Sequence, residues 1–193
     1  MTANGVDQMA TFGAQREAFL AQRILARDGR AFEEFYEGYR PRLSRFVVQL
    51  VKRPLLVEEV VNDTMMVVWN SLERFKGDSK LSTWIFAIAY RKGMRALTRN
   101  DDPRESVDDG IACDTPSPEQ NAAATQLHVA LASAMGRLSP DHRTVLDLSY
   151  FHELGTRDIA SIMDCPVDTV KTRLFHARKN LRNLLSGNGA DWL

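Results

Sequence analysis

One stretch near the middle of the chain constrains the fold more than any other feature. Residues 101–119, "DDPRESVDDGIACDTPSPE", carry seven acidic residues, one arginine and three prolines, and their few apolar residues follow no regular spacing. Proline and a high density of like charge both disfavour a packed helix or strand. We therefore expect a flexible acidic linker over residues 101–121, with a folded domain on each side of it.

The segments on either side of this linker both carry the apolar spacing of amphipathic helices. Through residues 57–72, side chains suited to a core recur at positions i, i+3, i+4 and i+7, which predicts a helix with one buried stripe. A sustained alternation of apolar and polar residues, the pattern of a half-buried strand, is absent. The sequence therefore predicts an all-α protein of two small helical domains, over residues 30–100 and 122–186. The stripe comprises Val57, Val60, Val61, Thr64, Met65, Val68 and Leu72.

The two ends of the chain lie outside these domains. Residues 1–29 are predicted to form an N-terminal extension with one amphipathic helix. We expect Gly29 to close that helix, because glycine readily adopts the left-handed conformation found after helix ends. Residues 187–193, "GNGADWL", are predicted to be a frayed tail.

Charged side chains are distributed unevenly over three helices predicted in the first domain. The helix over 57–72 has a mainly acidic and polar face opposite its stripe, whereas residues 40–53 of a preceding helix near 31–53 carry five Arg or Lys and no acid. A third helix, with Ser82 or Thr83 as its N-cap, exposes cations along "WIFAIAYRKGMRALTR". That helix is predicted to bury Ile85, Ile88, Ala89 and Leu97. These patterns alone do not separate a functional face from an ordinary solvated one.

The second domain shows the outline of a helix-turn-helix. Ser139 is placed to cap a helix that starts at Pro140, and Thr156 to cap a short helix that runs through Met163. A turn over 164–166 then precedes a longer helix from about residue 167. Two helices joined by so short a turn are typical of DNA-binding proteins.

The last predicted helix concentrates positive charge in a chain of zero formal net charge. Residues 167–186 contain five Lys or Arg and one Asp, whereas the whole chain has 25 cations and 25 anions. Cations neutralise DNA phosphates, arginine reads guanine edges, and Thr or Phe contacts a thymine methyl in the major groove. The turn and the charge together predict DNA binding, and a generic basic amphipathic helix is the less economical interpretation.

Other classes of protein are disfavoured by composition and motifs. Cys113 and Cys165, the only cysteines, suit a reducing cytosol, and with four scattered histidines they show no metal-ligand spacing. We expect no metal and no cofactor. The chain shows neither an apolar run of about 18 residues nor a signal-peptide core, so we expect a cytoplasmic protein without membrane insertion. No Gly-rich phosphate loop, nucleophile elbow or catalytic carboxylate pair is present, which disfavours an enzyme, and no catalytic residue is predicted.

Three segments closely resemble the bacterial RNA polymerase sigma factors of the extracytoplasmic-function (ECF) group of the sigma-70 family. "GTRDIASIMDCPVDTVKTRLFHARKNL" resembles their region 4 signature for minus-35 recognition. "VEEVVNDTMMVVWNSLERF" is similar to their region 2 polymerase-binding helix, and "STWIFAIAYRKGMRALTR" to the adjoining minus-10 and melting segment. The resemblance covers most of residues 30–186, and the linear order of the segments is more specific than either domain alone.

This resemblance implies roles for three groups of residues. Binding to the β′ clamp of the polymerase is implied for Glu59, Asn62, Asp63 and Met66. Holding the melted minus-10 strand is implied for Lys76, Lys80, Thr83, Trp84, Arg91 and Arg95. Contact with the minus-35 duplex is implied for Arg157, Lys171, Thr172, Arg173, Phe175, His176 and Arg178. Aromatic stacking and a cationic groove suit the task of holding unpaired bases.

The resemblance also implies partners. These are core RNA polymerase, through its β′ clamp and β flap, promoter DNA, and an anti-sigma protein that holds the factor inactive until a stress or environmental signal arrives. The chain departs from the family pattern at three places. Asn62-Asp63 stand where a Gln-Glu pair is common, Tyr90-Arg91 where an Arg-Asn pair is common, and His176 where an arginine is frequent.

A stand-alone transcriptional regulator is the main alternative on the residues themselves. In that interpretation the helix-turn-helix binds an operator, and the N-terminal half senses a ligand or dimerises. It predicts tight duplex binding without polymerase and a palindromic site. Charge reversal at Asp63 separates the two hypotheses, because it should prevent polymerase binding in one and leave operator binding intact in the other.

Overall fold

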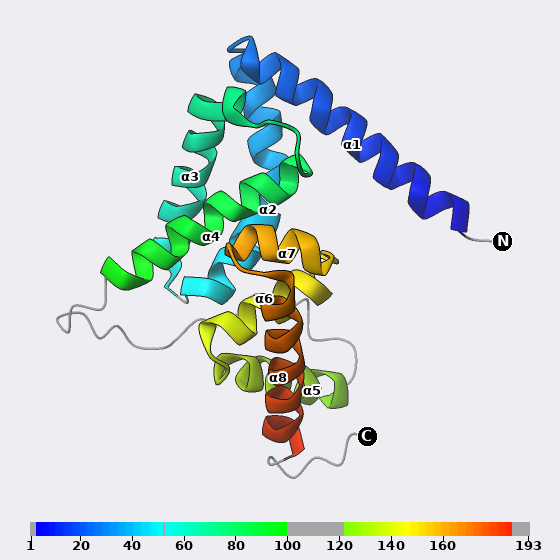
Figure 1. The fold of residues 1–193 in the computed structure, drawn as a ribbon, viewed down its shortest axis with the longest axis vertical. Coiled ribbons are helices and arrows are strands. Elements are labelled where there is room, and N and C mark those ends of the chain that lie inside the picture. Colours follow the sequence, from blue (N-terminus) through cyan, green and yellow to red (C-terminus); the bar gives the residue numbers. More distant parts are fainter. Residues whose placement is uncertain (1–2, 52, 100–121, 187–193) are drawn as a thin grey trace.

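In the computed structural model, which describes residues 3–51, 53–99 and 122–186, every regular element is a helix (Figure 1). The all-α prediction is therefore confirmed for these residues. The predicted linker, which contains Cys113, and the predicted tail lie outside them. The elements are α1 (Ala3–Leu25), α2 (Gly29–Val51), α3 (Pro54–Ser71), the 3-10 helix η1 (Leu72–Arg74), α4 (Leu81–Arg99), α5 (Ala122–Gly136), α6 (Pro140–Tyr150), α7 (Thr156–Met163) and α8 (Val167–Ser186).

The connection between α1 and α2 differs from the predicted one. α1 ends at Leu25, and Arg27 rather than Gly29 adopts the left-handed conformation, with φ 62°. The backbone N–H of Asp28 donates to the Arg23 carbonyl at 3.0 Å, as in a Schellman motif. Gly29 is already the first residue of α2. The prediction of helix closure at Gly29 is wrong because Asp28 caps α2 and so places the turn two residues earlier.

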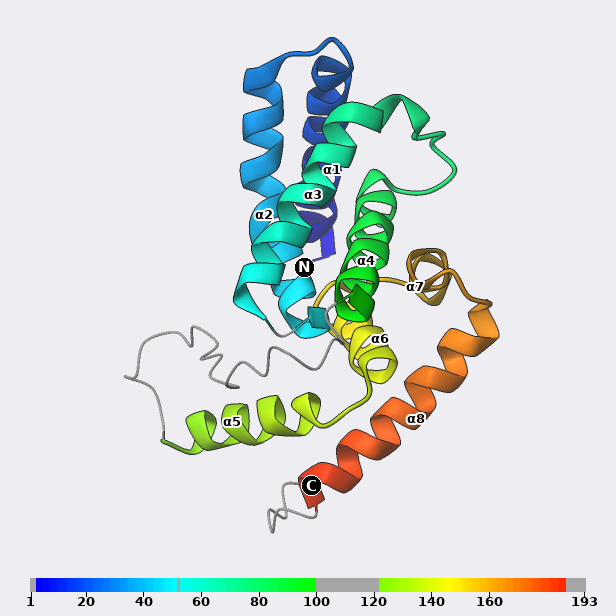
Figure 2. The same ribbon diagram turned by 90° about the vertical axis from the view of Figure 1, so that its left-hand side faces the viewer.

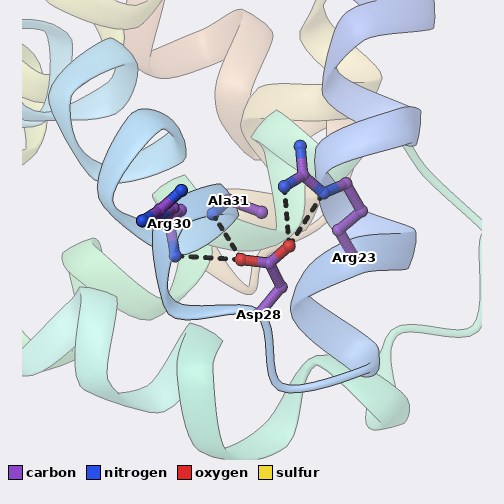
Figure 3. Close-up of polar contacts among 4 residues, drawn as sticks. All are labelled: Arg23, Asp28, Arg30 and Ala31. Carbon is purple, nitrogen blue, oxygen red and sulfur yellow. Dashed lines mark hydrogen bonds and ion pairs between the residues drawn. The ribbon is translucent and has the colours of Figure 1, made fainter.

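The carboxylate of Asp28 joins the two helices (Figure 3). Its Oδ1 accepts from the backbone N–H groups of Arg30 and Ala31 at 3.0 and 3.2 Å, which caps α2. Its Oδ2 accepts from Nε and Nη2 of Arg23 at 2.9 and 2.6 Å. The Arg23 hydrogen bonds, followed by that of Ala31, hold the pKa of the Asp28 carboxyl below its ordinary value of 3.8.

Asp28→Ala is expected to lower Tm by roughly 2 to 4 °C at neutral pH, because α2 and Arg23 lose their shared acceptor. Asp28→Asn keeps a cap and loses only the charge, so its effect should be smaller. Since the folded-state pKa is lowered, the contribution of Asp28 is complete above the unfolded pKa and disappears as pH falls through the folded pKa. Thermal unfolding by circular dichroism at neutral and acidic pH measures this. A Tm difference that persists unchanged into strong acid contradicts it.

Helices α2, α3 and α4 pack around one apolar core. All seven residues of the predicted stripe are buried, six on α3 and Leu72 on η1, which confirms the periodicity from which the stripe was inferred. Phe35, Leu43 and Phe46 of α2 and Ile85 of α4 are almost completely enclosed. α4 also approaches α2 so closely that a Cβ at Gly93 would overlap the side chain of Leu50. The first domain is therefore a rigid support for the outer faces of α3 and α4.

The start of α4 also differs from the prediction. The helix begins at Leu81, so neither Ser82 nor Thr83 is its N-cap. Leu81 is buried, and its packing in the core places the helix start before both hydroxyl residues. The Thr83 hydroxyl instead donates to Oδ1 of Asp158 on α7 at 3.1 Å.

Helices α6, α7 and α8 form the core of the second domain. Ser139 caps α6 as predicted, since its hydroxyl accepts a backbone N–H three residues further along at 3.3 Å. α7 begins at Thr156 and Gly155 occupies its N-cap position, so the prediction of Thr156 as the cap is wrong. Gly155 is extended, and the helical hydrogen bonds begin at its carbonyl. Asp164 then makes the turn in the left-handed region, with φ 51° and ψ 53°, and α8 starts at Val167.

The two domains lie directly against each other. α7 lies against α4, and α6 lies against α2 (Figures 1 and 2). The buried apolar residues of the two domains are continuous, so one apolar cluster extends through both.

Candidate protein-binding and nucleic-acid-binding surfaces

The outward face of α3 carries all four residues predicted to bind polymerase. Glu59, Asn62, Asp63 and Met66 are exposed, and Met66 is 52% accessible. Leu55 shares their stripe, four residues before Glu59, and is 84% accessible. Leu55 was not predicted from the sequence. Its spacing of four, seven and eleven residues to Glu59, Asn62 and Met66 is that of one helix face and could have identified it. These five residues are the α3 face, which combines apolar and acidic groups at one exposed site.

Three members of the α3 face have hydrogen-bond partners within the first domain. The bonds join Arg99 Nη2 to Glu59 Oε1 (2.7 Å), Lys92 Nζ to Asp63 Oδ2 (2.8 Å) and the Tyr36 hydroxyl to Asn62 Oδ1 (2.7 Å). The ion-paired side chains are 27–67% exposed. Ion pairs this accessible contribute only about 0–1 kcal/mol each. A protein that offers its own cations can therefore displace them at little cost.

Most residues predicted to hold a melted DNA strand are exposed on α4 and on the loop before it. Lys76, Lys80, Arg91 and Arg95 all reach solvent. Trp84 is half-buried, and its ring centroid lies 5.8 Å from that of Phe75. The spacing of seven and eleven residues places Trp84, Arg91 and Arg95 on one side of α4. An aromatic ring in line with two guanidinium groups suits base stacking with phosphate contact.

Thr83 is the exception in this group. Only 1% of its surface is accessible, because α7 covers it and Asp158 accepts a hydrogen bond from its hydroxyl. A nucleic acid therefore reaches Thr83 only if α7 moves away.

Four residues of the predicted minus-35 group form an exposed surface on α8, here called the α8 face. They are Lys171, Thr172, Phe175 and His176. Phe175 is 64% accessible, and its ring meets the His176 ring edge-on at 5.4 Å. Lys171 Nζ pairs with Asp168 Oδ1 at 3.0 Å, and both side chains are exposed. An exposed aromatic ring beside a cation and a hydroxyl fits contact with both bases and phosphates.

Two further cations continue the α8 face toward its C-terminal end. Lys179 and Arg182 are exposed four and seven residues after Phe175, and sequence reasoning did not select them. Their spacing from Phe175 places them on the same side of the helix, and this could have been recognised in the sequence. Arg157, the predicted residue on α7, is also exposed.

The other two predicted arginines are engaged with α6 or its surroundings. Arg173 Nη2 pairs with Asp141 Oδ2 at 2.6 Å, and Arg173 Nη1 lies 3.7 Å from the sulfur of Cys165. Cys165 is partly buried against the core, a position that suits a structural thiol. The Arg178 guanidinium lies over the Tyr150 ring, 5.5 Å from its centroid. Arg173 and Arg178 thus also help to fix α8 on its support.

The described residues provide neither a metal site nor a membrane-spanning helix. Among residues 3–51, 53–99 and 122–186, His, Cys, Asp and Glu side chains form no group of three or more that is suited to hold a metal ion. Within the same residues, no helix has both the length and the apolar character needed to span a bilayer.

Comparison with known proteins shows that both domains match regions of the same protein family. The family model for Sigma-70 region 2 matches residues 35–102, and the model for Sigma-70, region 4 matches residues 128–181. The chain is 29% identical to the ECF RNA polymerase sigma-E factor of Haemophilus influenzae, over 85% of this chain and 92% of that protein. It is 28% identical to the RNA polymerase sigma-H factor of Pseudomonas aeruginosa, over 89% and 94%.

A solved structure gives the same assignment. The sigma factor RpoE in complex with the anti-sigma factor NepR, from Bartonella quintana, superposes with a TM-score of 0.63 and 25% identity. The match covers 80% of this chain and 96% of that one.

A region 2 bundle followed by a region 4 helix-turn-helix defines the class of promoter-recognition subunits of bacterial RNA polymerase. The chain belongs to the sigma-70 family, and within it to the ECF group. Proteins of this family direct transcription initiation and are not themselves enzymes. The alternative of a stand-alone regulator is set aside, because the first domain is region 2 rather than a sensor domain.

Proposed function

We propose that the α3 face binds the clamp of the polymerase β′ subunit, and that α4 and α8 hold the two promoter elements. The observation that carries this proposal is that exposed side chains of different kinds gather on different helices. Acidic and apolar groups gather on α3, whereas cations and aromatic rings gather on α4 and on α8. Protein interfaces favour apolar groups with polar surroundings, and nucleic acids require cations.

The promoter elements are recognised in different ways in this proposal. Trp84 stacks on an unpaired base of the minus-10 element while Arg91 and Arg95 neutralise its backbone. The α8 face enters the major groove of the duplex minus-35 element, with Lys171 on phosphate and Phe175 on a base edge. Arg157 contributes from α7.

Polymerase completes the recognition by fixing the distance between the domains. Two weakly binding modules gain affinity through effective concentration when their separation matches their targets. The free chain is therefore expected to bind duplex DNA poorly, and contact of region 4 with the β flap sets the spacing.

Control by an anti-sigma protein is also proposed. The Bartonella quintana sigma factor that shares this fold is bound to an anti-sigma factor. We extend that kind of partner to this chain, in a stress or environmental response within the cytoplasm. The exposed α3 face is the surface whose occupation would prevent polymerase binding most directly.

Run-off transcription from a promoter library with bacterial core RNA polymerase tests the proposal. With this protein present, new start sites that share two upstream elements at a fixed spacing are expected. Core polymerase without the protein is the control. If no new start sites arise and the protein alone shifts duplex DNA tightly, the assignment of the two domains to polymerase and promoter is overturned.

A further inference from the structure

α8 contains a single acidic residue, and it lies beside the surface proposed to contact DNA. Asp168 precedes Lys171, Thr172 and Phe175 by three, four and seven residues, a spacing that places all four on one side of the helix. Its side chain is 90% accessible. A carboxylate that faces phosphates adds like-charge repulsion, so this position is unfavourable for DNA binding unless the group makes a specific contact.

The structure leaves most of this carboxylate available. Lys171 Nζ donates to Asp168 Oδ1 at 3.0 Å, and within the described residues this is the one hydrogen bond that the carboxylate accepts. It therefore makes no capping bond to the described backbone of its own helix. An acid in the first turn also interacts favourably with the helix dipole, but that interaction requires no particular side of the helix. Helix stability alone therefore does not explain why Asp168 lies in line with the α8 face.

The edges of the four bases differ in what they offer to a carboxylate. An ionised carboxylate only accepts hydrogen bonds. In the major groove, cytosine presents its N4 amino group as a donor, whereas guanine and thymine present oxygen acceptors that repel a carboxylate. Adenine presents a donor next to its N7 acceptor, and an amide side chain matches this pair better. In a helix-turn-helix the first residues of the second helix reach base edges, and Asp168 is the second residue of α8.

We propose that Asp168 is a specificity-determining residue that accepts a hydrogen bond from the N4 amino group of one cytosine in the minus-35 element. The inference rests on the proposed role of the α8 face. Lys171 holds the carboxylate through one N–H and donates another to a neighbouring phosphate, because its ammonium group has three. Oδ2 is then the oxygen that accepts from the base. In this arrangement Lys171 also offsets the repulsion between Asp168 and the DNA backbone.

Base preference measured with holoenzyme on a promoter library tests this inference. The library carries a randomised minus-35 element upstream of a fixed minus-10 element, and bound promoters are sequenced for wild type, Asp168→Ala and Asp168→Asn. Wild type is expected to favour cytosine at one position by roughly tenfold. Asp168→Ala should reduce that preference to less than about twofold and leave the other positions unchanged. Asp168→Asn should move the preference toward adenine, because an amide pairs with adenine N6 and N7.

A single promoter separates base recognition from a role in folding. When its cytosine is replaced by thymine, Asp168→Ala should bind more tightly than wild type, because a carboxylate no longer faces an acceptor. A residue that only stabilised α8 would weaken binding to both promoters when removed. Glu153→Gln removes one acid at an exposed position of the second domain outside α8, and it should leave every base preference unchanged. Circular dichroism shows that each variant is folded.

The outcomes distinguish failure of this inference from failure of the proposed function. If Asp168→Ala keeps all base preferences of the wild type, or loses a preference at an A·T pair instead, the inference is overturned. The proposed function then stands as long as Phe175→Ala still relaxes base preference. If wild-type holoenzyme shows no preference anywhere in the randomised element, the assignment of α8 to the minus-35 duplex fails, and the inference fails with it.

Discussion

Asp63→Lys is expected to prevent assembly with core RNA polymerase. The side chain of Asp63 is 56% exposed at the centre of the α3 face, where it forms a surface ion pair with Lys92. Reversing its charge places a cation beside Lys92 and against the cations expected on the clamp. Losses of about 2–5 kcal/mol are typical when a charge at the centre of an interface loses its partner. Titration of labelled protein with core polymerase should show affinity reduced by at least about thirtyfold, with a parallel loss of run-off transcription.

Glu37→Lys is the matched control for this prediction. It makes the same change of charge at an exposed position on α2, outside the α3 face. Its affinity for core polymerase should stay within about twofold of wild type, because exposed charges away from an interface act weakly at physiological salt. Equal weakening by both variants would indicate a general electrostatic effect and contradict a specific α3 site. Wild-type binding by Asp63→Lys would exclude the α3 face as the polymerase contact.

Within each domain, much of the fold could be predicted from local pattern. The predicted stripe over residues 57–72 is correct at all seven positions, because burial on one side of a helix imposes a period that the sequence displays directly. The Ser139 cap and the turn before α8 also follow from local chemistry. The three errors at helix ends have a common cause. Several residues near each end can supply a cap, and tertiary packing such as that of Leu81 selects among them.

The contact between the domains could not be predicted in this way. The uninterrupted apolar run over residues 84–90 was a signal that α4 is covered on more than one side, but nothing in the sequence identifies α7 as the second cover. His152 shows the difficulty most clearly. In the sequence it is an isolated histidine after a helix, yet in the structure its ring lies edge-on against Phe46 and Phe86, more than sixty positions earlier in the chain. The same long-range packing makes Thr83 inaccessible, which no property of its neighbours in sequence indicates.

The surroundings of Arg173 change the expected roles on α8. The sequence places Lys171 and Arg173 in the same predicted minus-35 group, whereas the structure pairs Arg173 with Asp141 and leaves Lys171 and Phe175 on the open side. Removal of Arg173 therefore disturbs the support of α8 as well as any DNA contact. Lys171 and Phe175 are the cleaner positions at which to measure recognition.

Lys171→Ala and Phe175→Ala should each weaken minus-35 recognition, but by different physical effects. Each is expected to cost about 1–3 kcal/mol in binding of holoenzyme to a two-element promoter. Lys171→Ala removes one phosphate contact, so the slope of log K against log salt should fall in magnitude by about 1. Phe175→Ala removes an apolar base contact and should leave that slope unchanged while relaxing base preference. Holoenzyme binding measured over a salt series gives both quantities.

A promoter that lacks the minus-35 element but carries a premelted minus-10 region provides the control template for both α8 variants. Neither variant should bind it differently from wild type, because α4 alone makes the DNA contacts there. The outward direction of Phe175, 64% accessible beside His176, is what makes a base contact physically reasonable. Equal losses on both templates would instead locate the defect in polymerase assembly or in folding. An unchanged affinity of Phe175→Ala for the complete promoter, with base preference intact, would show that the α8 face contacts only the DNA backbone.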